Sequence, residues 1–565
     1  MKTRFKIAMG AALVLALMLM LLTGCQSNGD PDTPAATPEP PPQEQQAEVP
    51  QVEDPQDEDE VETPAEFAYP MEGSHTVTIW EGLPGSLAPN FVSRGETQHS
   101  IWLEELTGIN IEWLHPPAGQ TAEQFNLIMA SRDFPDVMIT NWMVAYPGGP
   151  DRAIADGVIH RLNEIWDSYS PNVINFLHNE RPDIGRAART DTGNYFVFPF
   201  VRENAITQTF IGPYVRADWL NELGMDIPET LGDWEAMLIG FRDEYSATAP
   251  FSFIDGNRIW NPVAVAHGVK LNFHLNEAGD VVYGFVEPGY LEYLRVMNRW
   301  FSEGLLDPDF ATVNRDIINS RWATGDMGAS FDLAGGGLGG ILPAMLASDD
   351  PDHATFDLVA IPNPVLNRGD MPTHGHMVPG FQGVGSAAIT TSAGNIEAAA
   401  RLLDFGYSEE GHIFFNFGIE GETFEWVNGI PTYTDRVMNN VNGWPLAQYM
   451  QSVTRANFEG PFMQSQHFPP QFQALPQQRD ALFVWTQSDS ERFMLPPVTP
   501  TVDEADRIAM ILTDISSYVD EMRLRFIMGE ESLDNWDNYV STVFSMGLQE
   551  VLDVQNAALQ RFNNR

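Results

Sequence analysis

Cysteine and lysine are almost absent from this chain of 565 residues. Cys25 is the only cysteine, so the chain forms no intramolecular disulfide and its folded part depends on core packing. Beyond the first six residues Lys270 is the only lysine, so arginine supplies nearly all of the positive charge. We interpret the scarcity of lysine as a habit of composition and not as a site.

Positive charge is scarce as a whole. Residues 1–24 contain three basic and no acidic residues, so the rest of the chain carries 27 Lys and Arg against 78 Asp and Glu. Proteins bind nucleic acid through basic side chains that neutralise its phosphates. The scarcity of such side chains in this chain excludes nucleic acid as a partner. The same charge disfavours peripheral binding to anionic lipid. With 43% apolar residues the chain can bury large cores, and its length predicts more than one domain or lobe.

One long apolar run, at 7–22, follows three basic residues and precedes small residues. This is the three-part plan of a secretory signal peptide, and sixteen residues are short for a membrane span, which needs about 20. We therefore expect residues 1–24 to be cleaved. The tetrapeptide Leu22-Thr-Gly-Cys25 resembles a bacterial lipobox, which implies that Cys25 receives a diacylglyceryl group and holds the protein on the extracellular face of the cell membrane. An accidental lone cysteine is the alternative.

The segment 26–66 has 13 acidic residues, 9 prolines and no basic residue. Such a composition cannot bury enough apolar surface to fold. As a flexible coil its 41 residues would span roughly 35 Å. We therefore expect residues 25–70 to form a lipidated cysteine followed by a disordered acidic, proline-rich tether.

Alternating apolar patterns begin after this segment. They predict strands and helices in turn, in the order strand 76–80, helix 101–108, strand 109–113, helix 124–130 and strand 136–140. This rhythm is typical of a parallel sheet with crossover helices. The first third of the folded part is therefore predicted to be an open α/β lobe.

A further helix is predicted after Thr230, which can cap it together with Asp233 at the third helical position. The apolar residues Trp234, Met237, Leu238 and Phe241 would then share one buried face. Farther along, 275–283 is predicted to be a hairpin, 290–301 an amphipathic helix and 325–331 a strand that enters a loop at 332–340.

Several motifs resemble one family in their order and spacing. They are Met129-Ala-Ser-Arg-Asp-Phe-Pro-Asp-Val137, Tyr214-Val-Arg-Ala-Asp-Trp-Leu-Asn-Glu-Leu-Gly224, Pro228-Glu-Thr-Leu-Gly-Asp-Trp234 and Phe526-Ile-Met-Gly529. Together they are similar to the extracellular solute-binding proteins of carbohydrate ABC transporters, in the lipoprotein branch common in Gram-positive bacteria. The resemblance covers nearly all of 74–565.

The resemblance implies a two-lobed α/β fold of the periplasmic-binding-protein type (type II), with a hinge and extra C-terminal helices. Lobe one would take 71–205 plus 385–430, and lobe two 206–384 plus 431–565. It also implies a monomeric receptor, without enzymatic activity or cofactor. The receptor would capture a sugar, most simply an oligosaccharide, by hinge closure and deliver it to an ABC permease in the membrane.

A sugar receptor needs flat apolar faces and polar side chains that pair with hydroxyls, placed where strand ends converge. Three predicted strand ends carry such residues, which are Trp80, Glu81, Asn141, Trp142, Phe331 and Asp332. Further candidates are Trp260, Arg321 and Trp322. For each tryptophan, packing in the core is the alternative.

Other patterns have simpler interpretations. The glycines of 335–340 could present N–H groups to an anion, but a flexible cleft loop is favoured because the P-loop lysine is missing. His374 and His376 lack further metal ligands at the usual spacing, so loop or surface histidines are favoured. Asp307 and Asp309 lie in no EF-hand loop, and capping explains them without calcium. We expect no metal site.

Two other functions stay open. A surface-anchored polysaccharide-degrading enzyme would need a pair of carboxyl groups facing one cleft, and no pair stands out among the 78. A sensing lipoprotein would bind its ligand without transport. A charged ligand is disfavoured by the net charge, although Arg216 or Arg321 could supply local positive potential.

Overall fold

The computed structural model describes residues 68–456 and 460–565, which belong to one structural unit that begins at Glu66. The predicted signal peptide, the lipidated Cys25 and nearly all of the predicted tether lie outside the described residues. The structure therefore does not test these three predictions.

A six-stranded sheet organises the first lobe. Its strands follow the order β13-β4-β10-β3-β1-β2, with bounds β1 (His75–Trp80), β2 (Ile109–Leu114), β3 (Val137–Ile139), β4 (Phe198–Arg202), β10 (Phe381–Ile389) and β13 (Met463–Gln464). Strand β1 pairs in parallel with both β2 and β3, as the sequence predicts, and β10 is antiparallel to β3 and β4. The predicted α/β lobe at the start of the folded part is confirmed.

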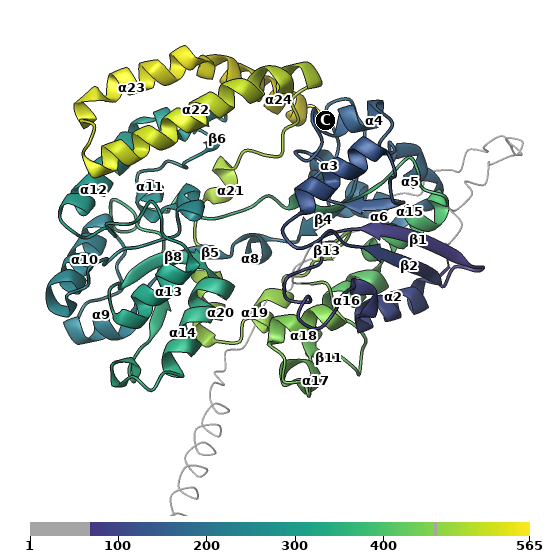
Figure 1. Cartoon of the computed structure of the whole chain (residues 1–565), viewed down its shortest axis with the longest axis horizontal. Helices are drawn as coiled ribbons and strands as arrows, with labels where there is room; N and C mark the ends of the chain where they lie inside the picture. The colour runs from purple at the N-terminus through teal and green to yellow at the C-terminus, as the bar shows by residue number, and fades with distance from the viewer. Residues whose placement is uncertain (1–67, 457–459) are drawn as a thin grey trace, which may run out of the picture. The chain divides into compact units, whose positions relative to one another are not determined.

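Helices lie on both sides of this sheet (Figure 1). Their bounds are α2 (Gln98–Thr107), α3 (Thr121–Ser131), α4 (Gly149–Ala155), α5 (Asn163–Tyr169), α6 (Pro171–Asn175), α7 (Pro182–Ala187), α15 (Ile396–Asp404), α16 (Glu409–Phe417), α17 (Asp435–Met438) and α18 (Leu446–Val453). A small hairpin of β11 (Phe424–Val427) and β12 (Ile430–Tyr433) follows α16. Helix α2 ends at Gly108, whose φ of 71° is the left-handed conformation that glycine tolerates.

The second lobe is built on a three-stranded antiparallel sheet of order β8-β5-β9. Its strands are β5 (Ile211–Arg216), β8 (Ala329–Leu333) and β9 (Leu358–Ala360), and β6 (Phe273–Leu275) and β7 (Val281–Tyr283) form the predicted hairpin. Its helices are α9 (Ala217–Leu223), α10 (Leu231–Tyr245), α11 (Pro262–Ala266), α12 (Pro288–Ser302), α13 (Arg315–Thr324), α14 (Gly339–Leu346), α20 (Pro476–Trp485) and α21 (Ser490–Phe493). The C-terminal helices α22 (Val502–Met528), α23 (Trp536–Val543) and α24 (Gln549–Asn563) follow, and α22 packs along α12.

Three segments connect the two sheets. They are 203–210, which contains α8 (Ala205–Gln208), 361–380, and 465–475, which contains α19 (Phe468–Phe472). Strand β13 pairs with β4, and α18 contacts α2, so the chain up to 472 lies with the first sheet. We therefore propose lobe boundaries of 68–205 plus 379–472 and 206–378 plus 473–565, which moves 379–384 and 431–472 from lobe two to lobe one.

Helix α10 shows how closely local sequence determines structure. The Asp233 N–H donates to Thr230 Oγ1 at 3.1 Å, and the Thr230 N–H donates to Asp233 Oδ2 at 2.9 Å. This capping box and the predicted buried face, with Trp234 at its start, are both present. The cap satisfies N–H groups that a helix leaves without intrahelical partners.

Thr230→Ala is expected to lower the free energy of unfolding by about 1 kcal/mol, because it removes the oxygen that accepts the Asp233 N–H. Thr121→Ala is the matched control, since the N-terminus of α3 has no side-chain cap bond, and should stay within about 0.5 kcal/mol of the parent. Chemical denaturation followed by circular dichroism measures both. Equal effects in the two variants would show that the cap bond does not stabilise α10.

One interpretation of the sequence, that of the glycine run, is wrong in detail. The segment 332–340 is not a flexible loop, because a π-helical turn at Ala334–Leu338 continues directly into α14. His374 and His376 do lie in a loop, as predicted, but both are buried and not at the surface.

Candidate functional site

A cavity of about 630 Å³ lies where the connecting segments pass between the two sheets. Both lobes contribute to its walls. The lining residues are Arg202, Ile206, Thr207, Phe210, Leu333, Gly335, Gly336, Gly339, Leu446, Ala447, Gln464, Phe468, Pro469, Phe472, Gln473, Ala474, Gln478 and Leu482. The volume lies within the range of roughly 300–1,000 Å³ that is typical of small-molecule sites.

Arg202 is the charged residue of this wall. Its Nη1 donates to Thr207 O at 2.8 Å and to Gln464 Oε1 at 2.9 Å, and its guanidinium carbon lies 5.0 Å from the centre of the Phe210 ring. These contacts hold the guanidinium over an aromatic ring. The wall therefore offers a fixed N–H donor group beside an apolar surface.

Another part of the cavity wall, around Gln478, requires a glycine at position 339. Gln478 Nε2 donates to Ala334 O at 2.9 Å and to Gln473 Oε1 at 2.6 Å. A Cβ atom at Gly339 would stand 1.9 Å from Gln478 Nε2, so only glycine leaves room for this amide. Part of the glycine run thus admits a polar side chain to the cavity wall.

Three aromatic rings continue from the cavity into the second lobe. The centres of the Phe210 and His376 rings are 4.3 Å apart, and those of His376 and Trp260 are 4.5 Å apart. The Phe210 N–H donates to His376 Nδ1 at 3.3 Å, which places the proton of a neutral imidazole on Nε2. Trp260 is the one predicted site residue in this row.

His376 is neutral at physiological pH. Burial lowers the pKa of His376 to about 3, and the nearby positive charges of Lys270 and Arg202 add to the effect. Within the described part of the chain, His376 Nε2 and Trp260 Nε1 are both buried and have no hydrogen-bond partner. Such groups are costly to leave unpaired, so this end of the row favours a ligand that supplies oxygen acceptors.

Asp332 lies next to the cavity but does not face it freely. The carboxylate is buried, forms an ion pair with Arg315 and accepts a hydrogen bond from Asn257 Nδ2 at 3.2 Å. The following residue, Leu333, lines the cavity. Asp332 therefore positions this strand end, and its role toward a ligand stays a proposal.

Three aromatic residues that were predicted to contact a ligand are instead buried in the cores of the lobes. Trp142, Phe331 and Trp322 are fully buried and present no face to a ligand. Trp142 packs against Phe125, and Trp322 stacks on Tyr214 with ring centres 5.7 Å apart. Their large apolar surfaces stabilise the cores of the two lobes instead.

Trp80 and Glu81 also turn inward. Trp80 packs on Phe125, and the Glu81 residue is only 4% exposed, between Arg94 and Arg455. Burial alone would raise the pKa of Glu81, but the two guanidinium groups outweigh it and hold the pKa below its usual value. Glu81 is thus an ionised carboxylate that ties the end of β1 to a distant segment of the same lobe.

The remaining predictions, Asn141 and Arg321, are partly exposed. Asn141 Oδ1 accepts the Met143 N–H at 3.2 Å and so shapes the turn after β3. Arg321 pairs with Asp307 at 2.7 Å and with Asp309 at 2.8 Å, which places it in an ion-pair cluster and not on the cavity. Neither residue lines the cavity.

Sequence reasoning missed most of the cavity wall because it comes from the connecting segments. One signal was available. The stretch 464–478 combines six glutamines with three prolines and so offers many amide groups in a short segment. Seven of the lining residues belong to it, namely Gln464, Phe468, Pro469, Phe472, Gln473, Ala474 and Gln478.

No group of three or more His, Cys, Asp or Glu side chains within 68–456 and 460–565 is arranged to hold a metal ion. Over the same residues, the structure contains no helix both long and apolar enough to cross a membrane.

Comparison with known proteins supports the architecture. No family model matches the chain. A solved structure of the ABC-transporter substrate-binding protein FusA of Streptococcus pneumoniae, in complex with kestose, superimposes with a TM-score of 0.68 at 19% identity, and the match covers 86% of this chain and 99% of that one. The fold is that of a solute-binding protein. A human-milk-oligosaccharide (HMO) binding protein from Bifidobacterium longum infantis gives a TM-score of 0.69 at 18% identity, over 87% of this chain and 99% of the other.

Sequence comparison agrees with the resemblance found in the motifs. The chain is 23% identical to FusA, a fructooligosaccharide ABC transporter substrate-binding protein, over 491 residues, which are 80% of this chain and 85% of FusA. It is also 23% identical to lipoprotein LipO of Bacillus subtilis over 371 residues, which are 63% of this chain and 70% of LipO. The predicted similarity to oligosaccharide-binding proteins of ABC transporters, including a lipoprotein, is confirmed.

Proposed function

We propose that this chain is a lipid-anchored extracellular receptor that binds an oligosaccharide between its two lobes and delivers it to an ABC permease. The observation that carries the proposal is the cavity of about 630 Å³, whose wall is built by both lobes and by the segments that connect them. A ligand in such a place contacts more protein when the lobes close, and this difference drives closure.

The chemistry of the wall suits a sugar. Phe210 supplies a flat apolar face for the C–H surface of a sugar ring, and Trp260, which does not line the cavity itself, lies at the far end of the same aromatic row. Arg202 supplies N–H donors for hydroxyl and ring oxygens. Relatives that bind oligosaccharides share the fold and much of the chain length, which supports the same ligand class here.

The anchor would be the lipid on Cys25, followed by the acidic tether that holds the receptor away from the membrane. With the lipid in the membrane, the folded unit would face the outside of the cell. The closed form would then dock on the permease, where opening of the lobes releases the sugar.

A thermal-shift screen of the chain without residues 1–24, carrying Cys25→Ser, tests the proposal against neutral and acidic oligosaccharides, kestose among them. We expect at least one sugar to raise the melting temperature, since a ligand at 100 times its Kd stabilises the folded state by about 2.7 kcal/mol. Each stabilising sugar is then recovered and analysed. An intact sugar supports the receptor, whereas a cleaved sugar would replace it by a polysaccharide-degrading enzyme, and a screen without any hit would contradict sugar binding.

A further inference from the structure

The C-terminal helix α24 is fixed to the second lobe near its middle. Asn556 Oδ1 accepts the Val281 N–H at 2.9 Å, and Asn556 Nδ2 donates to Val281 O at 3.3 Å, so this side chain continues the edge of the β6–β7 hairpin. Val551 and Val554 of the same helix pack on Ile508 of α22. This half of α24 therefore moves with the second lobe.

The last turn of α24 packs on the first lobe. Phe562 is part of the hydrophobic core around the six-stranded sheet. The guanidinium carbon of Arg565 lies 5.0 Å from the centre of the Phe562 ring, and that of Arg186 lies 5.7 Å from it. The end of the chain is thus inserted between the second lobe and the core of the first.

Asp191 of the first lobe receives both terminal arginines. Arg565 Nε donates to Asp191 Oδ1 at 3.0 Å, and Arg561 Nε donates to the other oxygen, Oδ2. The Asp191 side chain is only 6% exposed. Two guanidinium groups on one buried carboxylate form a charge-assisted contact that is costly to break.

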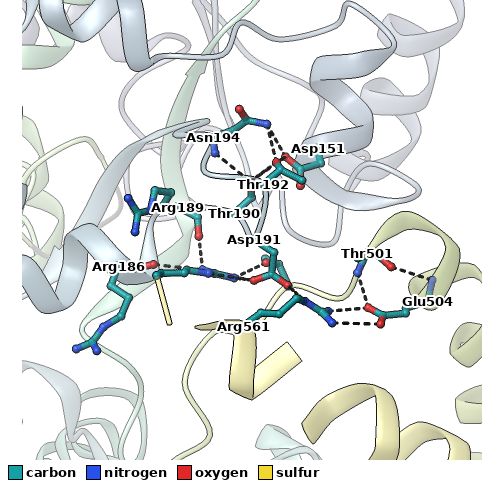
Figure 2. A network of polar contacts seen from close by, with 12 residues as sticks. Asp151, Arg186, Arg189, Thr190, Asp191, Thr192, Asn194, Thr501, Glu504 and Arg561 are labelled. Atoms are coloured by element: carbon teal, nitrogen blue, oxygen red, sulfur yellow. Dashed lines mark hydrogen bonds and ion pairs between the residues drawn. The ribbon is translucent and has the colours of Figure 1, made fainter. Parts of the chain in front are cut away.

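The turn that carries Asp191 is itself held rigidly (Figure 2). Asp151 Oδ1 accepts hydrogen bonds from Thr190 Oγ1 and Thr192 Oγ1, both at 2.8 Å, and from Asn194 Nδ2 at 2.9 Å. Asp191 therefore faces the C-terminal helices from a fixed position.

The start of α22 joins the same network. Arg561 Nη2 donates to Glu504 Oε2 at 2.7 Å, and Glu504 Oε2 also accepts the Thr501 N–H at 2.8 Å in the cap of α22 (Figure 2). Arg561 of α24 thus links Asp191 of the first lobe to the start of α22.

Arg561 follows Asn556 by only five positions, which is about 7.5 Å of helix. So short a helical piece transmits rotation and bends little, which means that the two lobes cannot turn freely about the connecting segments. We infer that Arg561 and Arg565, bound to Asp191, are positioning residues that limit the angle between the lobes in the chain without ligand.

The consequence for affinity rests on the proposed function. When the lobes close on a ligand they become ordered, and the conformational entropy lost in this step weakens binding. The cost is smaller in a chain whose lobes already keep a narrow range of angles. The C-terminal contact with Asp191 would therefore raise the affinity without touching the sugar. Its removal is expected to weaken binding about fivefold.

Distances between spin labels test the angle directly and need no ligand. The chain with Cys25→Ser has no other cysteine, so labels attach only at Ser168→Cys on α5 and Ser320→Cys on α13, both at exposed positions of different lobes. We expect the interlobe distance distribution to become at least about twice as broad in Arg561→Ala/Arg565→Ala. Asp191→Asn, which removes the charge and keeps the volume, should broaden it in the same direction, and Arg561→Lys/Arg565→Lys should restore most of the narrow width.

Arg507→Ala is the matched control, because Arg507 pairs with Glu550 within the C-terminal helices and reaches no residue of the first lobe through that ion pair. Its distribution should equal that of the parent. An unchanged width in both the double variant and Asp191→Asn, or equal broadening by Arg507→Ala, would overturn the inference. Kestose added to the parent tests the proposed function separately, since a failure of sugar binding leaves the widths of the ligand-free variants as they are.

Discussion

Replacing Glu81 by alanine is expected to lower the free energy of unfolding by about 3–5 kcal/mol, the usual effect of removing one partner from a buried ion pair. The Arg94 and Arg455 side chains are 3% exposed, and both guanidinium groups lie about 5.6–5.7 Å from the ring of Trp113. Without the Glu81 carboxylate, the Arg94 and Arg455 guanidinium groups would stay buried beside the Trp113 ring and lose the anion that pairs with both of them.

The pH dependence of stability follows from the same contact. The folded-state pKa of Glu81 lies below its usual value, so ionisation is favoured in the folded chain and its stabilising effect is complete above the unfolded-state pKa near 4.5. As the pH falls through the folded-state pKa, this contribution is lost. Glu81→Gln, which cannot ionise, should remove this part of the acid destabilisation.

Chemical denaturation at pH 7 and at lower pH values measures both effects. Glu105→Ala is the control, because Glu105 is an exposed residue on α2, and a change of less than about 0.5 kcal/mol is expected there. The experiment also separates two roles of Glu81. If Glu81→Ala kept its full stability and lost only sugar binding, the original interpretation of Glu81 as a ligand contact would hold and the structural role would be wrong.

Local features of the fold were predictable because their causes lie within a few residues. Thr230 and Asp233 cap α10 through side chains three positions apart, and the strands β1 and β2 follow from alternation over five or six residues. The hairpin β6–β7 follows from its turn residues in the same way. In each case another local conformation would lose the helix cap, the buried alternation or the turn geometry that these residues favour.

The cavity was not predictable from the same patterns. Its wall joins Arg202, Leu333 and Gln478, which are separated by more than a hundred residues along the chain. No short-range pattern reports which parts of the connecting segments meet. The glutamine-rich stretch 464–478 indicates an unusual segment, but only the packing of α19 and α20 brings it to the cavity.

The aromatic residues at strand ends show why the placement of site residues failed. Trp142 follows β3 as expected, but α3 brings Phe125 against it and closes the surface. A tryptophan at a strand end satisfies two patterns equally well, since the same flat face can cover a sugar or complete a core. Which of the two occurs depends on the helix that packs above the strand, and that is a tertiary contact.

Trp260 differs from these residues because it remains partly exposed at the end of the row formed with His376 and Phe210. If the proposed function is correct, Trp260→Ala should weaken sugar binding about 30-fold, which corresponds to about 2 kcal/mol for a central aromatic contact. Trp260→Phe keeps the apolar face and loses the indole N–H, so a smaller loss of about fivefold is expected, the size of one hydrogen bond.

Isothermal titration calorimetry with a sugar that stabilises the parent measures both variants, at a temperature where circular dichroism shows them folded. Trp426→Ala is the matched control, because Trp426 is 47% exposed on the β11–β12 hairpin and does not line the cavity. Its affinity should equal that of the parent. Equal affinities for Trp260→Ala and the parent would place the sugar elsewhere, whereas a graded loss from Phe to Ala would show that the ring face and the indole donor act together on the same ligand.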